Sequence, residues 1–230
     1  TDFPKHWTVQ LNDTHPAIAV AELMRLLIDQ YHIGWDKAWN ITTQSVAYTN
    51  HTLLPEALEK WDLHLFNDLL PRHLEIIYEI NWRFLQQLRL RYPGDDKILR
   101  KLSIIDEEGT KSVRMAHLAT IGAHHINGVA TLHSDLIKRQ LLPEFAELWP
   151  EKFTNVTNGV TPRRWVALAN PGLSDLLDKE IGSDWITNMK LMENLEKKQS
   201  DLNFLEKFQD TKLLGKRKLS NYIHSKTGIL

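Results

Sequence analysis

Residues 48–59 read Y-T-N-H-T-L-L-P-E-A-L-E, and the expected fold is organised around them. An apolar approach typical of a strand ends in the polar turn T-N-H-T at residues 49–52. Pro55 then suits the first position of a helix, where no backbone N–H is needed. Glu56 and Glu59 lie three residues apart, which predicts that they share one face of that helix. A strand end that brings Asn, His and a helix N-terminus together predicts a polar pocket in an α/β fold.

The composition is that of a globular protein with room for one large domain or two small ones. The 230 residues are 42% hydrophobic and 25% charged, and the formal net charge of -1 favours neither nucleic acid nor an anionic membrane as a partner. The chain has 0 cysteines, which excludes a disulfide scaffold, a thiolate nucleophile and cysteine-ligated zinc. It also fits a reducing compartment. No apolar run approaches the ~20 residues that span a bilayer.

The two ends of the chain predict a segment of a longer protein. Thr1 stands where an initiator methionine is expected, and residues 228–230 lead out of a turn toward a strand that does not continue. No secretory signal is recognised at the start.

Hydrophobic periodicity predicts mostly helices. The clearest is residues 72–91, whose apolar residues form a wide stripe. Residues 104–114 predict a hairpin with an acidic tip that contains one glycine. Residues 8–11 predict a short strand. Further helices are expected at residues 17–31, 35–46 and 134–148, the last with Ser134 as its N-cap, and at 165–169, 173–179, 185–198 and 202–224.

Three polar clusters suggest where a ligand binds. They are N-D-T-H at residues 12–15, T-N-H-T at 49–52 and T-N-G-V-T at 157–161. The first two lie where a predicted strand passes into a helix, so they also fit helix caps and turns. If their Asn, Asp and His side chains converge, hydroxyl-rich molecules such as sugars are the natural ligands.

Other site chemistries receive little support. The histidines at 117, 124, 125 and 133 form no H-E-x-x-H pattern, so no metal site is predicted. No G-x-S-x-G elbow and no phosphate-binding glycine loop is found. Arg163 and Arg164 suit either an anion or ion pairs at a domain seam, and the second interpretation is favoured.

Several long strings of sequence form an ordered set along nearly the whole chain. They are V-Q-L-N-D-T-H-P at residues 9–16, A-Y-T-N-H-T at 47–52, L-P-E-A-L-E-K-W at 54–61, L-P-R-H-L at 70–74, M-A-H-L at 115–118, N-G-V-A at 127–130 and T-N-G-V-T-P-R-R-W at 157–165. Together they resemble the α-glucan phosphorylases, which act on glycogen, starch and maltodextrin.

The resemblance implies an α/β fold of the GT-B glycosyltransferase type, predominantly helical in this segment, with a few short strands. Residues 1–153 would be the C-terminal part of the N-terminal domain, and residues 154–230 the start of the C-terminal, cofactor-binding domain. The implied reaction is reversible phosphorolysis of terminal α-1,4-linked glucose to glucose 1-phosphate. The alternative is a non-catalytic carbohydrate-binding or interaction module on the same fold.

The resemblance also assigns roles to individual residues. His51 resembles a catalytic residue whose backbone carbonyl faces the reacting sugar and whose ring contacts a glucose hydroxyl. Asn158 resembles a second residue that binds a glucose hydroxyl. The polar wall beneath the anomeric carbon is implied for Asp13, His15 and Glu59.

The implied cofactor is pyridoxal phosphate, bound by a lysine outside this chain, with Trp165 beside it. Lys190 lies in an N-M-K string like that of the cofactor lysine, but we predict a solvent-facing helix residue. The segment alone is therefore expected to be inactive. Tyr78 and Asn81 more loosely resemble a remote oligosaccharide site. The whole enzyme is expected to use α-1,4-glucan and inorganic phosphate, and to be an allosteric homodimer in the cytoplasm, or in a plastid if the source is a plant.

Overall fold

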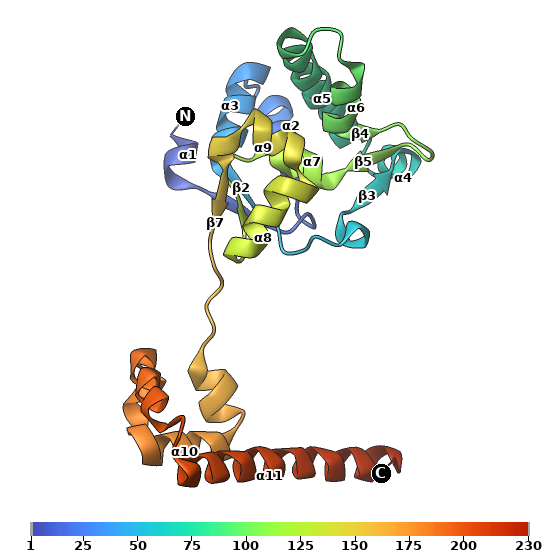
Figure 1. The fold of residues 1–230 in the computed structure, drawn as a ribbon. Coiled ribbons are helices and arrows are strands. Elements are labelled where there is room, and N and C mark those ends of the chain that lie inside the picture. Colours follow the sequence, from blue (N-terminus) through green and yellow to red (C-terminus); the bar gives the residue numbers. More distant parts are fainter. Residues whose placement is uncertain (1, 230) are drawn as a thin grey trace. The chain divides into compact units, whose positions relative to one another are not determined.

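The computed structural model describes residues 2–229, and the chain divides between Asn158 and Gly159 into two compact units (Figure 1). The sequence predicts a domain boundary slightly earlier, between residues 153 and 154. That these units are parts of the two domains of a GT-B fold stays a prediction. Leu230, the end of the predicted turn-to-strand segment, lies outside the described residues.

A parallel sheet forms the centre of the first unit. Its strand order is β1-β2-β6-β7, and every neighbouring pair is parallel. Parallel neighbours need long crossover connections, which helices supply here. The α/β fold class is therefore confirmed. The strands are β1 (Val9–Asn12), β2 (Val46–Thr49), β6 (Ile126–Gly128) and β7 (Phe153–Asn155).

Helices connect these strands. Between β1 and β2 lie α2 (Ala19–Arg25), the π-helical turn Leu26–Gln30 and α3 (Trp35–Ser45). Between β6 and β7 lie α8 (Thr131–Leu136), the π-helical turn Ile137–Leu141, α9 (Pro143–Leu148) and the 3-10 turn Pro150–Lys152. The predicted helix 35–46 is one residue too long, because Val46 already pairs with Val9 as the first residue of β2.

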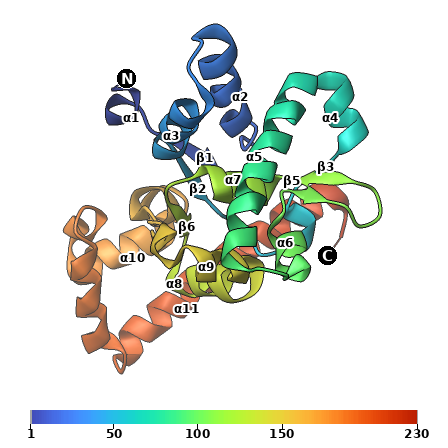
Figure 2. The ribbon, with the colours of Figure 1, turned by 90° about the horizontal axis from the view of Figure 1, so that it is seen from above.

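A long insertion between β2 and β6 forms a second, antiparallel sheet of order β3-β5-β4 beside α5 and α6 (Figure 2). The predicted hairpin is confirmed by the pairing of β4 with β5, and the predicted helix 72–91 is confirmed as α5. The insertion contains the 3-10 turn Pro55–Ala57, β3 (Lys60–Asp62), α4 (Leu63–Leu69), α5 (Pro71–Arg91), α6 (Asp96–Leu102), β4 (Ile105–Asp106), β5 (Ser112–Arg114) and α7 (Met115–Gly122).

The helix predicted to begin at Pro55 is wrong. Only a single 3-10 turn, Pro55–Ala57, forms there, so Glu56 and Glu59 do not share a helix face. The carbonyl of Glu59 instead accepts a hydrogen bond of 3.1 Å from the backbone N–H of Met115, at the start of α7. A long-range backbone partner thus overrides the local helical signal.

Ser134 is not a helix cap. It lies inside α8, which begins at Thr131. Its hydroxyl oxygen lies 3.0 Å from the carbonyl oxygen of Ala130 and 2.8 Å from Oδ1 of Asn155. A serine inside a helix commonly satisfies its hydroxyl on the carbonyl four residues earlier.

The second unit is helical around a buried tryptophan. Trp185 is fully buried and donates a 2.8 Å hydrogen bond to Oδ1 of Asp178. The predicted helix 185–198 is not one continuous α-helix, since this stretch forms two 3-10 segments. The elements are the π-helical segment Arg163–Leu168, α10 (Pro171–Ile181), the 3-10 segments Ser183–Ile186 and Met189–Lys198, and α11 (Leu202–Thr227). None of the described helices is long and apolar enough to cross a membrane.

His117 is a buried imidazole between α7 and the neighbouring elements. Its Nδ1 lies 2.9 Å from the carbonyl oxygen of Ser103, and its ring meets the ring of Phe145 edge-on at 5.0 Å. Burial, with the nearby Arg114 guanidinium, lowers the pKa of His117 to about 4. The folded protein therefore keeps this ring neutral at pH values where the unfolded chain protonates it.

We expect the first unit to lose stability as the pH falls from about 6.5 to about 4. In that window the unfolded chain binds more protons at His117 than the folded chain does. Replacing His117 by glutamine should flatten the pH dependence of the unfolding free energy by on the order of 3 kcal/mol. Urea unfolding between these pH values measures it, with the exposed His64→Gln as a matched control. An unchanged slope in His117→Gln would contradict the prediction.

Candidate functional site

The carboxyl ends of the four parallel strands share one edge of the sheet, called here the carboxyl edge. Residues 12–15 lie at the end of β1, residues 50–52 follow β2, and residues 156–158 follow β7. Ligands of open α/β sheets bind at this edge. The fold therefore brings the first two polar clusters, and the start of the third, to one place.

His51 is held at the carboxyl edge by the end of the neighbouring strand. Its Nε2 lies 2.5 Å from Oδ1 of Asn12, the last residue of β1. An amide oxygen only accepts, so in the neutral ring Nε2 carries the proton and Nδ1 is the acceptor. The side chain is exposed. His51 therefore presents an oriented ring to solvent, with Nδ1 suited to accept from a ligand hydroxyl.

Asp13 and Glu59 are joined through Thr14. The hydroxyl of Thr14 donates to Oε2 of Glu59 at 2.6 Å, and its backbone N–H donates to Oδ1 of Asp13 at 2.8 Å. Asp13 has a φ of 66°, a left-handed conformation that is uncommon outside glycine and is often found at functional sites. The backbone N–H of Asp13 donates to the Thr49 carbonyl at 2.9 Å. Two carboxylates therefore belong to one hydrogen-bonded wall.

A ladder of polar side chains crosses three strands beneath this wall. Gln10 Nε2 donates to Oγ1 of Thr49 at 2.8 Å, and Thr49 Oγ1 donates to Oδ1 of Asn127 at 2.8 Å. Gln10 and Asn127 were not predicted from the sequence as parts of the site. The sequence signal for them was a polar residue in or near a short, mostly apolar strand.

Asn158 is positioned by the loop that follows β6. Its backbone N–H donates to the carbonyl of Val129 at 3.0 Å, and the N–H of Val129 donates to Nδ1 of His133 at 3.1 Å. Burial, with the His51 ring nearby, lowers the pKa of His133. The buried Nε2 of His133 has no hydrogen-bond partner within residues 2–229. These contacts link Asn158 to His133 through the backbone of Val129.

Tyr48 and Asn50 form the buried support of the His51 turn. Both are fully buried, and Nδ2 of Asn50 lies 3.2 Å from the hydroxyl oxygen of Tyr48. Burial raises the pKa of Tyr48 well above its ordinary value, so the phenol stays neutral. The N–H of Asn50 donates to the Asn127 carbonyl at 3.0 Å. The turn that carries His51 is thus fixed on both sides.

The structure brings some predicted site residues together and separates others. Asp13, His51 and Glu59 belong to connected contacts, and Asn158 is linked to the same edge through Val129. His15 directly follows Thr14 and is exposed. Trp165 belongs to the second unit, where 64% of it is exposed.

A cavity of about 540 Å³ lies beside Tyr78 and Asn81, the residues of the more loosely implied oligosaccharide site. Tyr78 is exposed there. Asn81 is mostly buried, and its Oδ1 accepts a 2.8 Å hydrogen bond from the N–H of Ile104. Asn81 therefore shapes this cavity mainly through the backbone that it holds.

Neither a metal centre nor a cofactor lysine is evident among the described residues. Within residues 2–229, no group of three or more His, Asp or Glu side chains is arranged to hold a metal ion. Lys190 lies on the 3-10 segment Met189–Lys198 and is exposed. It does not offer the desolvated amine that a Schiff base favours.

Comparison with known proteins gives consistent matches along the chain. The family model described as carbohydrate phosphorylase matches residues 1–230. The chain is similar to a glycogen phosphorylase of Synechocystis sp., with 57% identity over 100% of this chain and 27% of the relative. It is 50% identical to a glycogen phosphorylase of Chlamydia trachomatis and 48% identical to the liver form of Ovis aries, over 96% of this chain in each case. The chain spans about a quarter of the length of these relatives, 27% and 26% respectively.

Proposed function

Because this chain belongs to the carbohydrate phosphorylase family, we propose that it is the sugar-binding segment of an α-glucan phosphorylase. The proposed reaction of the whole enzyme is reversible phosphorolysis of terminal α-1,4-linked glucose. Inorganic phosphate takes the glucosyl group to form glucose 1-phosphate, and its proton goes to the glycosidic oxygen of the shortened glucan. The names of the relatives, which are glycogen phosphorylases, support this proposal.

The observation that carries the proposal is the hydrogen-bonded wall at the carboxyl edge. His51 is oriented by Asn12, and the carboxylate of Glu59 is held by Thr14. Breaking a glycosidic bond develops positive charge on the sugar, and preorganised negative groups stabilise such charge. We assign that electrostatic role to Asp13 and Glu59. His51 and Asn158 are assigned to orient glucose hydroxyls, and His15 to complete the polar wall.

Pyridoxal phosphate is proposed as the cofactor of the whole enzyme, where its phosphate group would supply acid–base chemistry to the substrate phosphate. The described residues do not by themselves fit this group. Trp165 offers an exposed aromatic face for it, while Lys190 is solvent-facing. The binding lysine is therefore assigned to a part of the enzyme outside these residues.

The remaining expectations are proposals for the whole enzyme. They are a GT-B architecture divided near residues 154–158, a homodimer under allosteric control, and a cytoplasmic location, or a plastid location in a plant. The cavity beside Tyr78 is proposed as a surface site for oligosaccharide, supported by the exposed phenol ring at its rim.

The test is release of glucose 1-phosphate from glycogen and from short maltodextrins by the full-length parent protein. We expect release that requires inorganic phosphate. The 230-residue chain alone should release none, because it holds only one wall of the site. A parent that binds glucan without phosphate-dependent cleavage would favour the binding-module alternative. Turnover by the chain alone would contradict the divided site.

A further inference from the structure

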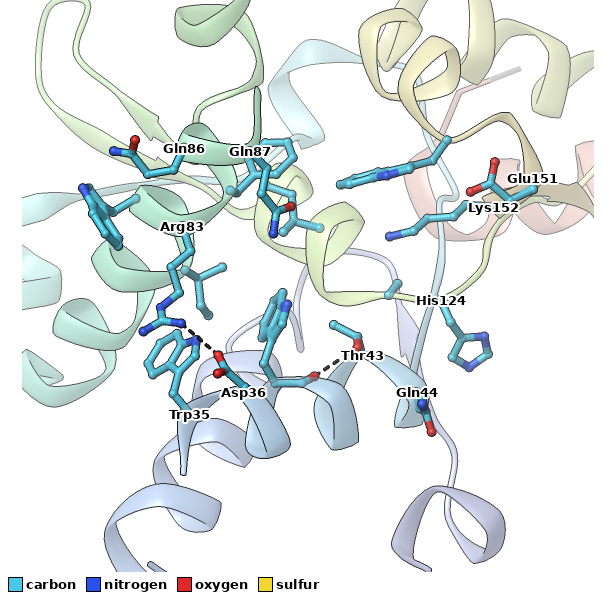
Figure 3. Close-up of a pocket in the computed structure, with 17 residues that line it drawn as sticks. Trp35, Asp36, Thr43, Gln44, Arg83, Gln86, Gln87, His124, Glu151 and Lys152 are labelled. Carbon is cyan, nitrogen blue, oxygen red and sulfur yellow. Dashed lines mark hydrogen bonds and ion pairs between the residues drawn. The ribbon is translucent and has the colours of Figure 1, made fainter. Parts of the chain in front are cut away.

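A second cavity, of about 620 Å³, lies in the first unit at the opposite edge of the parallel sheet (Figure 3). Three residues that line it stand just before strands: Gln44 before β2, His124 before β6 and Lys152 before β7. The amino ends of parallel strands share one edge, so we call this cavity the amino-edge pocket. Its size is within the range of ~300–1,000 Å³ that is usual for ligand sites.

Indole rings form much of the wall of the amino-edge pocket. Four of the eight tryptophans of the chain line it: Trp35 and Trp39 from α3, Trp82 from α5, and Trp149 from the segment after α9. Trp35 and Trp39 are four residues apart, so both lie on one face of α3. None of the four is fully buried, and 55% of Trp82 is exposed. The opening therefore offers flat apolar ring faces to a ligand.

The charges of the pocket are largely engaged with one another. Arg83 donates to Asp36 at 3.0 Å and to Glu79 at 2.7 Å, and its guanidinium lies 4.9 Å from the ring centre of Trp35. Figure 3 shows the Arg83 side chain directed toward Asp36. One guanidinium faces two carboxylates, so this group of side chains keeps a net negative charge.

Lys152 is the cation on the opposite wall. Its Nζ lies 3.9 Å from the ring centre of Trp149 and 3.5 Å from the carbonyl oxygen of Thr120. Burial lowers the pKa of Lys152 to about 8, so the amine is still mostly protonated at neutral pH. The carboxylates of Asp36 and Glu151 also line the pocket and oppose a bound anion. A neutral ligand is favoured over phosphate.

Uncharged polar groups complete the lining. The side-chain amides of Gln44 and Gln87 and the hydroxyl of Thr43 line the pocket. In Figure 3 the Gln87 amide and the Lys152 amine extend into the same open space from opposite sides. Amides donate and accept hydrogen bonds together, as vicinal sugar hydroxyls do. Flat apolar faces beside such groups fit a pyranose ring, which has apolar C–H faces and a hydroxyl rim.

We propose that the amino-edge pocket binds a short run of glucose units of an α-linked glucan, away from the hydrogen-bonded wall at the carboxyl edge. The glucose identity rests on the proposed function, whereas the fit to a neutral pyranose rests on the lining. The pocket and the hydrogen-bonded wall lie at opposite edges of one sheet. The pocket would therefore bind the glucan polymer and take no part in bond cleavage.

The direct test is titration of the 230-residue chain with maltoheptaose, observed by NMR at the tryptophan Nε1–H signals. We expect the signals of Trp35 and Trp39 to shift; Trp82 also lines the cavity beside Tyr78, so its signal does not distinguish the two cavities. Trp39→Leu should weaken maltoheptaose binding about tenfold, as followed at the Trp35 signal. Gln87→Ala, a surface change that is safe for folding, should weaken it roughly three- to tenfold. Tyr78→Ala, in the other cavity, is the matched control and should leave these shifts in place.

A second readout uses the full-length parent. The KM for glycogen should rise in Trp39→Leu and Gln87→Ala, while kcat with short maltodextrins stays unchanged. If both variants keep the KM of the parent for glycogen, the pocket inference fails and the proposed function stands. If the parent releases no glucose 1-phosphate although maltoheptaose shifts the signals, the proposed function fails instead. Shifts caused by inorganic phosphate and not by maltoheptaose would overturn the inference.

Discussion

Replacing His51 by alanine in the full-length parent is expected to lower kcat/KM for glucan phosphorolysis by roughly 10- to 100-fold. The change removes the ring that Asn12 orients at 2.5 Å and keeps the backbone carbonyl that the proposal also places against the sugar. Only the contact between the ring and a sugar hydroxyl is lost. Initial rates of glucose 1-phosphate release over a range of maltodextrin concentrations measure the effect.

Two further variants test whether the loss of activity is specific to the His51 ring. Asn12→Ala should have a smaller effect of up to about tenfold, because it removes the anchor of the ring and not the ring itself. The exposed His64 lies on α4 and has no assigned role in the site, so His64→Ala should leave kcat/KM unchanged. A His51→Ala enzyme with the kcat/KM of the parent would remove His51 from the proposed site.

Replacing Gly128 by alanine is expected to destabilise the first unit by about 1–3 kcal/mol or more. A Cβ at residue 128 would lie 2.5 Å from Oγ of Ser134 and 2.9 Å from its backbone N and Cα. A hydroxyl can rotate away, but the backbone of α8 cannot yield without moving the helix. The free energy of unfolding in urea measures the loss.

The same substitution should also disturb the site. The Gly128 carbonyl accepts from the N–H of Val156, and the adjacent Val129 carbonyl accepts from the N–H of Asn158. Any shift of α8 therefore reaches Asn158 and should weaken glucan binding. Ser134→Ala in the Gly128→Ala background should restore little stability, because the backbone clash remains.

Gly34→Ala is the matched control for this prediction. Residue 34 has a φ of -60°, and no atom lies within 4 Å of a Cβ placed there. Residue 34 is the N-cap of α3, where replacing glycine by alanine is expected to cost about 1 kcal/mol or less, below the loss at residue 128. Equal losses at residues 34 and 128 would show that the close approach to α8 is not the cause.

Local patterns predicted the parts of the fold that depend on neighbouring residues. The apolar stripe of residues 72–91 predicts α5, because helical periodicity is set by residues three and four apart. The acidic tip with Gly109 predicts the β4–β5 hairpin, and that glycine adopts a φ of 65°. Both elements form within a short stretch of chain, so the sequence contains their full signal.

Elements held by distant partners escaped prediction. Strand β6 has three residues, too few for a period, and it exists because Ile126 pairs with Tyr48 on one side and Phe153 on the other. Glu59 leaves its expected helix because the N–H of Met115 binds its carbonyl. Ser134 has a capping side chain, but the segment is already helical from Thr131.

The sequence by itself determined the family and the polar residues of the candidate wall, since long strings such as residues 9–16 and 47–52 are specific. Only the tertiary structure decided how they meet. It places the end of β1 beside the turn after β2, so that Asn12 contacts His51 and Thr14 contacts Glu59. It also assembles the amino-edge pocket from α3, α5 and Lys152. Parallel strands that pair are far apart in the sequence, because a long crossover must connect them. No local sequence pattern therefore indicates which strand becomes a neighbour.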